Sequence, residues 1–387
     1  MRTVLLRTNS CQPDPRVEKE VNSLLTLRDL PLRVVCWDRD GRKGKYQEML
    51  EVANGQVPIT RFGIPASWGG GMKANFFPML KFEWKLFWWL MFHQKEYDTV
   101  HACDLLTGLP AWLPCKLFHK RMVYDIFDYY AATAHGPEKL LNIFRKLENG
   151  IINSADVTII CSEKRQEQIA GAKPRKLVVL HNAPSSEQIF GCGVSGLTAQ
   201  GSPARTRIVY VGNLVDDRFI TKALASAEKL PEVEFHIGGF GVLEDQVRQM
   251  AQTHDNIYFY GKLAYKDVLA LEQQCHIMLA LYDPAVPNHT YAAPNKFYEA
   301  LALGKPLVMF HNTGMDGIVE AQDIGAVCEA TEEGLLEAFR TLIARKSEWD
   351  RMGKSMRELF ESDYSWDIMG QRLCAVYTEL KSGEEKK

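Results

Sequence analysis

Short runs rich in β-branched and aliphatic residues recur along the whole chain of 387 residues, and helix-length segments separate most of them. The first half carries one series, from TVLL (3–6) to LVVLHN (177–182). The second half carries another, from RIVYVGN (207–213) to AVCEA (326–330). This alternation is typical of parallel strands with helices packed on both faces of the sheet. The sequence therefore predicts an α/β fold with two doubly wound, Rossmann-like domains.

The segment between the two series is rich in Gly, Ser, Ala and Thr, a composition typical of a loose connection. We therefore predict an N-terminal domain over 1–190, a linker over 191–205 and a C-terminal domain over 206–365. Apolar residues recur near helical spacing in 366–387, which predicts a final helix that crosses back to the N-terminal domain. Because ligands bind at the carboxyl ends of parallel strands, we expect the domains to face each other across an interdomain cleft.

Composition excludes several classes of protein. A formal net charge of -2 gives no overall attraction to nucleic acid, so no nucleic-acid partner is expected. Nine cysteines without a C-x-x-C pair argue against a disulfide framework and against a zinc site, and we expect reduced thiols and no metal. The start of the chain resembles a first strand rather than a signal peptide, and the longest apolar run of interest, FWWLMF (87–92), is far short of the roughly 20 residues that span a bilayer. These features predict a cytoplasmic protein.

The stretch APNKFYEALALGKPLVMF (293–310) predicts a helix that opens at Pro294 and Asn295 and stops before a short buried strand. Lys296 and Glu299 are three residues apart and therefore lie on one face of its first turn. Free backbone N–H groups and the helix dipole make that turn an anion site, and Lys296 adds a positive charge. Glu299 suits paired hydroxyls, as on a ribose. A nucleotide diphosphate carries both groups, whereas the alternative is an exposed ion pair contributing about 0.2–0.5 kcal/mol.

Several motifs, taken in order, resemble those of GT-B glycosyltransferases, specifically the retaining bacterial polysaccharide and glycolipid enzymes of the group 1 and family 4-like type. They are NSCQPDPRVEKEVNSL (9–24), VHACDLLTGLPA (100–111), ADVTIICSEKRQEQI (155–169), LVVLHNAP (177–184), IVYVGNLVDDRF (208–219), IGGFGVLEDQV (237–247), FYGKLAYKDVLAL (259–271) and APNKFYEALALGKPLV (293–308). The resemblance implies a GT-B fold and transfer of a sugar, with retention, from a nucleotide-diphosphate sugar to a glycan or lipid-linked acceptor.

In that family the C-terminal domain binds the donor. The resemblance places Glu299 on the ribose hydroxyls and Lys296 toward the diphosphate. The family pattern has a first glutamate where this chain has Tyr291, which leaves the identity of the sugar open. The further donor-binding positions that the resemblance implies are Gly212, Asn213, Arg218, Gly239 and Asn295.

The N-terminal domain is expected to bind the acceptor, and a carboxylate or imidazole at a strand end there can receive or orient the acceptor's proton. The predicted catalytic residues are Asp128, His101 and Asp125, with Asp104 and His135 as further polar candidates. Residues 73–95 concentrate tryptophan, phenylalanine and lysine, which suits either a core helix or peripheral contact with the inner face of a membrane. Two other functions stay open: a hydrolysing sugar-nucleotide epimerase of the same fold, and a degenerate member that binds without turnover.

Overall fold

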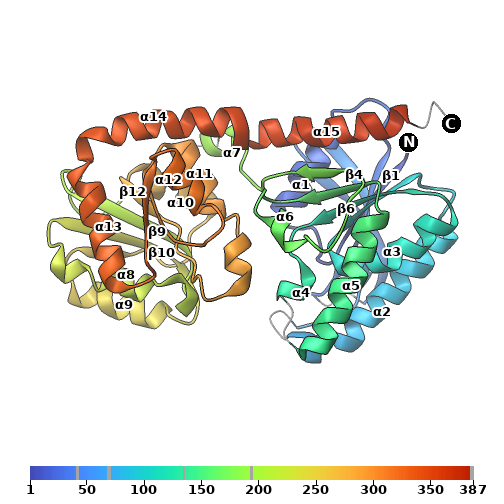
Figure 1. Ribbon diagram of the computed structural model, residues 1–387, viewed down its shortest axis with the longest axis horizontal. Helices are drawn as coiled ribbons and strands as arrows, with labels where there is room; N and C mark the ends of the chain where they lie inside the picture. The colour runs from blue at the N-terminus through green and yellow to red at the C-terminus, as the bar shows by residue number, and fades with distance from the viewer. Residues whose placement is uncertain (41–42, 68–70, 134–135, 192–194, 384–387) are drawn as a thin grey trace. The chain divides into compact units, whose positions relative to one another are not determined.

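The computed structural model describes residues 1–40, 43–67, 71–133, 136–191 and 195–383, with the backbone alone for 71–73. The chain divides into two compact units. Unit 1 consists of Met1–His181 with Met369–Lys387, and unit 2 consists of Asn182–Ile368. Each unit is an α/β body with its own sheet (Figure 1). The predicted pair of doubly wound domains is confirmed.

Unit 1 is built on an eight-stranded sheet in the order β3-β4-β2-β1-β5-β6-β7-β8. Every neighbouring pair is parallel except the antiparallel pair β3 and β4. The order reverses between β1 and β5, so the strand ends there form the switch point where ligands bind in such sheets. The strands are β1 (Thr3–Arg7), β2 (Leu32–Asp38), β3 (Gly44–Val52), β4 (Gly55–Gly63), β5 (Thr99–Cys103), β6 (Arg121–Ile126), β7 (Val157–Ile160) and β8 (Leu177–Val179).

Helices cover both faces of this sheet (Figure 1). One face carries α2 (Gly71–Phe92), α3 (Leu105–Leu117) and α5 (Glu138–Ser154), whose apolar side chains share a core with Val4, Leu6 and Val35. The other unit 1 helices are α1 (Pro15–Leu24), α4 (Tyr130–Thr133), α6 (Arg165–Gln168) and the part of α15 (Trp366–Ser382) from Met369 onward. Among the described residues, no helix combines the length and apolarity needed to cross a membrane.

The hairpin of β3 and β4 was not predicted. Its outer strand is mostly exposed, so it lacks the continuous apolar run that identifies a buried strand. The two turn residues are Ala53 and Asn54, and the Asn-Gly dipeptide that ends the turn was the available signal, since both residues favour turns.

Unit 2 has an entirely parallel six-stranded sheet in the order β11-β10-β9-β12-β13-β14. Its order reverses between β9 and β12, which is the arrangement of a dinucleotide-binding fold. The strands are β9 (Thr206–Asn213), β10 (Val233–Phe240), β11 (Ile257–Phe259), β12 (Ile277–Leu279), β13 (Leu307–Phe310) and β14 (Gly325–Cys328).

Two helical layers enclose the unit 2 sheet. Ile208 and Phe235 share a core with α8 (Ile220–Leu224), α9 (Glu244–Thr253) and α13 (Glu332–Ala344). Val209 and Met278 face the opposite layer of α10 (Tyr265–Gln273), α11 (Asn295–Leu303), α12 (Asp316–Ala321) and α14 (Trp349–Leu359). The remaining short elements are α7 (Ser186–Phe190), η1 (Asp216–Arg218), η2 (Ala227–Lys229), η3 (Pro287–Tyr291), η4 (Lys346–Glu348) and η5 (Phe360–Tyr364).

The segment predicted as a loose linker is held against unit 2 in its described part, 195–205. The Ser195 hydroxyl donates to Asp267 at 2.7 Å, and the backbone N–H of Ala199 donates to Gln274 at 3.0 Å. Ala199 is buried. The small polar residues that suggested flexibility serve here as hydrogen-bonding partners of α10 and its end, so this segment is a part of unit 2.

Candidate active site

The predicted donor-binding residues gather at the carboxyl end of β9, the strand at the switch point of unit 2. Gly212 and Asn213 end this strand, and Gly239 lies opposite Gly212 on β10. Gly239 has φ +139°, and a Cβ there would lie 1.8 Å from the Gly212 carbonyl oxygen. Only glycine allows the two backbones to approach this closely. The ends of β9 and β10 therefore pack backbone against backbone.

Lys296, in the first turn of α11, extends its side chain to the same strand end. A Cβ on Gly212 would lie 2.6 Å from Lys296 Nζ, and that Nζ lies 4.9 Å from the centroid of the Tyr210 ring. No side chain caps the helix at Pro294, and Asn295 at its first position is exposed. The first turn of α11 therefore lacks a side-chain cap and carries the Lys296 ammonium to the end of β9, and both features suit a bound phosphate.

Glu299 lies one turn further along α11 and is buried, with 6% of its surface exposed. The alternative interpretation of Lys296 and Glu299 as a solvent-exposed ion pair is therefore wrong. A second carboxyl, Glu272 on α10, is buried close to both. Burial raises the pKa of Glu272 well above its ordinary value, the Glu299 charge raises it further, and Lys296 opposes the rise.

Arg218 belongs to a polar cluster on the loop after β9. Its guanidinium lies 3.9 Å from the centroid of the Tyr282 ring and donates to Asp217 at 2.7 Å. The buried His289 accepts from the same guanidinium through Nε2 at 3.4 Å, and its Nδ1 lies 2.8 Å from the Asp283 carbonyl oxygen. Asp217 balances the Arg218 charge, as expected of a surface arginine, but the stacked ring also fixes its direction. Tyr282, Asp217 and His289 therefore hold the Arg218 guanidinium in place.

Sequence reasoning missed several members of this site. Tyr210 lies under Lys296 and donates its hydroxyl hydrogen to the Asn213 carbonyl oxygen at 2.8 Å. Tyr282 and His289 follow β12 and hold Arg218. Their positions just after a central strand were the available signal, since loops at the carboxyl ends of strands carry ligands. Tyr291, which stands where the family has a glutamate, ends η3 and is half-buried.

In unit 1, Asp128 follows β6 and has an exposed side chain, with 60% of its surface accessible. Its Oδ1 accepts from the buried Arg165 at 3.1 Å, and its backbone N–H donates to Asp104 at 3.1 Å. Asp104 also accepts from Arg7 at 2.7 Å. These contacts hold an exposed carboxylate at the carboxyl edge of the unit 1 sheet. His135 lies outside the described residues.

His101 and Asp125 are not placed to touch a substrate, because both are fully buried in unit 1. Asp125 accepts from Arg16 at 2.7 Å, and His101 lies 3.4 Å from Asp125 and 2.9 Å from the Tyr377 hydroxyl. Burial alone raises the pKa of Asp125, but Arg16 and the His101 hydrogen bond outweigh it and hold the pKa below its usual value. Their prediction as catalytic residues is corrected here. They join α1, β5, β6 and α15 through a buried polar network.

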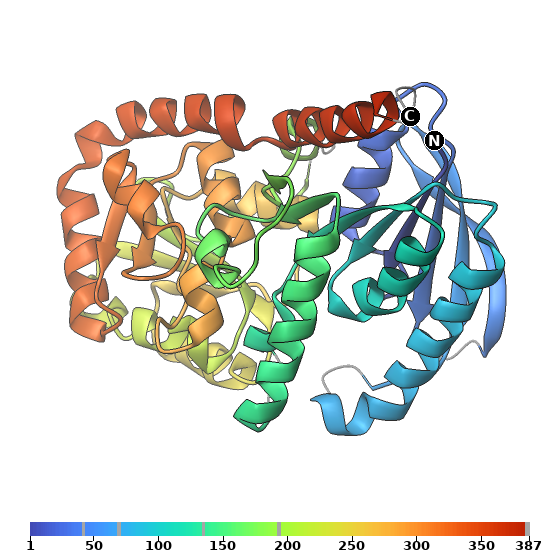
Figure 2. The ribbon, with the colours of Figure 1, turned by 45° about the vertical axis from the view of Figure 1, so that its right-hand side comes forward.

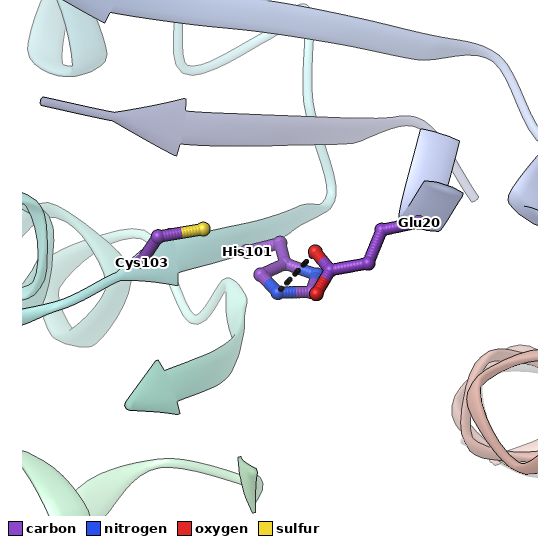
Figure 3. Close-up of side chains that lie close together, drawn as sticks. All are labelled: Glu20, His101 and Cys103. Atoms are coloured by element: carbon purple, nitrogen blue, oxygen red, sulfur yellow. Dashed lines mark ion pairs between the residues drawn. The ribbon is translucent and has the colours of Figure 1, made fainter. Parts of the chain in front are cut away.

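Glu20, His101 and Cys103 each place one ligand atom within 4.8 Å of the others in the same network. Figure 3 shows the Glu20 carboxylate beside the His101 ring, with Cys103 further along the strand. Arg16 already pairs with Glu20 at 3.0 Å and with Asp125, so a divalent ion here would lie next to a positive charge. Burial raises the pKa of Glu20 to about 7, which also disfavours the ionised ligand. The cluster fits a buried ion-pair network better than a metal site.

Comparison with known proteins identifies the family. The family model described as Glycosyl transferases group 1 matches residues 205–345, and the Glycosyl transferase 4-like domain model matches residues 24–183. Glycogen synthase from Mycobacterium tuberculosis is 25% identical over 303 residues, which are 75% of this chain and 70% of that protein. The two family models together span most of the chain.

Solved structures show the same fold. Sucrose-phosphate synthase from Thermosynechococcus elongatus matches with a TM-score of 0.71 at 16% identity, over 99% of this chain and 100% of that one. HepE from Anabaena in complex with UDP-glucose matches with a TM-score of 0.63 at 15% identity, over 97% and 99% of the two chains. The chain belongs to the GT-B glycosyltransferases and is a glycosyltransferase.

Proposed function

We propose that this glycosyltransferase moves a sugar from a nucleotide-diphosphate sugar to a glycan or lipid-linked acceptor in the synthesis of a surface polysaccharide or glycolipid. One observation carries the proposal: Lys296, in the uncapped first turn of α11, extends its Nζ to the glycine end of β9, and the buried Glu299 lies one turn further along the helix. That pairing suits a diphosphate next to a ribose. The complex of HepE with UDP-glucose supports the same class of donor.

The chemistry that follows is stabilisation of the leaving group. When the bond between the anomeric carbon and the phosphate oxygen breaks, negative charge grows on the diphosphate, and Lys296 and Arg218 are the cations positioned to stabilise it. We propose transfer with retention, in which the acceptor oxygen bonds to the anomeric carbon on the face that the diphosphate leaves. The departing diphosphate takes the acceptor's proton. Glu299 holds the ribose hydroxyls throughout.

Asp128 is the carboxylate proposed to orient the acceptor hydroxyl. It is exposed, it lies at the carboxyl edge of the unit 1 sheet, and Arg165 fixes its direction. The expectation that no metal assists donor binding remains part of this proposal, because two protein cations can neutralise the diphosphate. EDTA is then expected to leave turnover unchanged, and a loss that Mg²⁺ restores contradicts it.

The test is release of nucleotide diphosphate from a panel of sugar nucleotides, with and without a bacterial membrane extract as the source of acceptor. If the enzyme transfers a sugar, one donor is expected to give release of nucleotide diphosphate that depends strongly on the membrane extract. Slow, extract-independent release of nucleotide from a single donor contradicts transfer and favours hydrolysis. Binding without release, with any donor and with extract present, supports a degenerate member, the outcome that Tyr291 in place of a glutamate suggests.

A further inference from the structure

Helix α2 carries two apolar stripes, and only one of them serves the core of unit 1. Phe82, Leu86 and Leu90 recur at spacing four and are fully buried against the sheet. A second stripe at the same spacing faces solvent and consists of Phe76, Leu80, Trp84, Trp88 and Phe92. Residues four apart share a helix face, so the two stripes are two distinct faces. The buried stripe is sufficient to attach the helix, and the fold gives no reason for the exposed one.

The exposed stripe is a continuous aromatic surface. Trp84 is 64% exposed and Phe92 is 78% exposed. The Trp84 and Trp88 rings meet edge to face at 5.6 Å, and the Trp88 and Phe92 rings stack at 5.4 Å. Beside the stripe, Phe77 is 79% exposed. Contiguous exposed apolar surface of this kind marks an interaction site in a folded protein.

Helix α3 extends this surface. Figure 2 shows α2 and α3 side by side on the outside of unit 1, and their side chains share one core. Leu113 and Leu117 on α3 are each 55% exposed. Between the helices lies a groove of about 320 Å³ lined by Leu80, Glu83, Trp84, Phe87, Leu109 and Pro110. We call the exposed stripe of α2, with Phe77, Leu113 and Leu117, the α2–α3 face.

The α2–α3 face is flanked by positive charge. Lys81 and Lys116 are exposed, and Lys85 is half-buried. By sequence, Glu83 is the single acidic residue of the two helices. Burial raises the pKa of Glu83 to about 7, which reduces its negative charge near neutral pH. A partner that covers the α2–α3 face would therefore meet lysines at its edges.

We propose that the α2–α3 face docks onto a bilayer leaflet rich in anionic phospholipids, with Trp84, Trp88 and Phe92 at the boundary of headgroups and acyl chains. Tryptophan favours that boundary because its ring is apolar and its N–H is polar. Lys81 and Lys116 then meet lipid phosphates, and an anionic leaflet contributes about 1 kcal/mol per lysine near its surface. This inference rests on the lipid-linked form of the proposed acceptor and names the partner of unit 1.

A second copy of the chain fits this face less well. A two-fold interface brings the same patch of both copies together, so Lys81 and Lys116 of each copy would approach one another with Glu83 as the single acidic residue of these helices to offset them. An anionic leaflet instead neutralises them. Charge complementarity therefore selects the bilayer as the occupant.

The test is co-sedimentation of the full chain with vesicles of equal parts phosphatidylglycerol and phosphatidylcholine, compared with pure phosphatidylcholine, without any sugar nucleotide. The wild type is expected to sediment with the anionic vesicles. Trp84→Ser with Trp88→Ser is expected to lower the bound-to-free ratio by about tenfold or more, and so is Lys81→Glu with Lys116→Glu. Phe190→Ser and Lys354→Glu are the matched controls, since both residues are exposed in unit 2 and both variants keep the face intact.

Three results overturn the proposal. The wild type stays in the supernatant with anionic vesicles, or both double variants sediment like the wild type, or sedimentation velocity shows a dimer that the Trp84→Ser, Trp88→Ser variant loses. Because the assay contains no donor, a chain that releases nucleotide yet ignores vesicles refutes the docking alone. A chain that binds vesicles but uses no donor refutes the proposed function alone.

Discussion

Lys296 extends from the first turn of α11 to the end of β9, so close to Gly212 that a Cβ on that glycine would lie 2.6 Å from its Nζ. The Lys296 ammonium thus lies at the end of β9, the strand at the switch point of a parallel sheet. Parallel α/β sheets bind their ligands at this place, and the chemistry present favours an anionic ligand.

Lys296→Ala is expected to weaken binding of UDP, the test nucleotide, by about tenfold or more, because a hydrogen bond to a charged group contributes roughly 1.5–3 kcal/mol. Isothermal titration calorimetry measures the change. Lys354→Ala is the matched control, since this lysine has 77% of its side chain exposed on α14. Equal affinity of Lys296→Ala and the wild type would falsify the assignment of Lys296 to the diphosphate.

Glu299→Gln tests the ribose contact separately. The variant is expected to bind UDP about tenfold more weakly, because a carboxylate that accepts from two hydroxyls forms stronger bonds than an amide oxygen. A 2′,3′-dideoxy analogue of UDP offers no such hydroxyls and is expected to bind the variant and the wild type alike. If the variant loses affinity for both nucleotides equally, Glu299 acts through the structure of α11 and not through the ribose.

Asp128→Asn and Asp125→Asn separate catalysis from structure in unit 1. Asp128 is exposed, so its variant is expected to keep the wild-type Tm while turnover falls at least about tenfold. Asp125→Asn removes the charge of one of the two carboxylates that pair with the buried Arg16, and breaking a buried ion pair costs roughly 3–5 kcal/mol of the free energy of unfolding. Urea unfolding measures the stability of both variants, and nucleotide release measures their turnover. If Asp125→Asn keeps its stability but loses turnover, while Asp128→Asn keeps its turnover, Asp125 is again the catalytic candidate.

The sequence predicted the parallel strands well because each buried strand is a short continuous run, such as 207–213 and 307–310. The family resemblance, rather than a local signal, assigned Lys296 and the end of β9 to one donor site. Local signals do not reveal long-range burial. The partners that bury Asp125 are Arg16 on α1 and His101 on β5, which is packed in turn against Tyr377 on α15. The spacing of residues along the chain does not predict that Arg16, His101 and Tyr377 surround Asp125.

Gly239→Ala tests the close approach of β9 and β10. The new Cβ would meet the Gly212 carbonyl oxygen at 1.8 Å in a backbone conformation at φ +139°. We expect the free energy of unfolding to fall by roughly 2–4 kcal/mol, as for strained backbone changes with a steric clash. Gly317→Ala on α12 is the control, because nothing lies within 4 Å of the point that its new Cβ would occupy, and alanine there is expected to stabilise by about 0.5–1 kcal/mol. If Gly239→Ala leaves the free energy of unfolding unchanged, the close approach of β9 and β10 does not require glycine.

Glu148 provides a prediction about pH. It is fully buried on α5 and accepts a hydrogen bond from the Tyr124 hydroxyl at 2.8 Å. Burial raises its pKa to about 8 from an ordinary value of 4.5. Between these two pH values the unfolded chain releases the proton that the folded chain retains. The contribution of Glu148 to stability is therefore largest at pH values below 4.5 and is lost as the pH rises toward 8.

Glu148→Gln removes this titration while its amide oxygen can still accept from Tyr124. The variant is therefore expected to have a larger free energy of unfolding than the wild type above pH 8, and the two are expected to converge near pH 4.5. Urea denaturation across that range measures the difference. Glu138→Gln, at an exposed position on the same helix, is expected to show no such trend. A difference between wild type and Glu148→Gln that does not change with pH means that Glu148 is ionised in the folded chain.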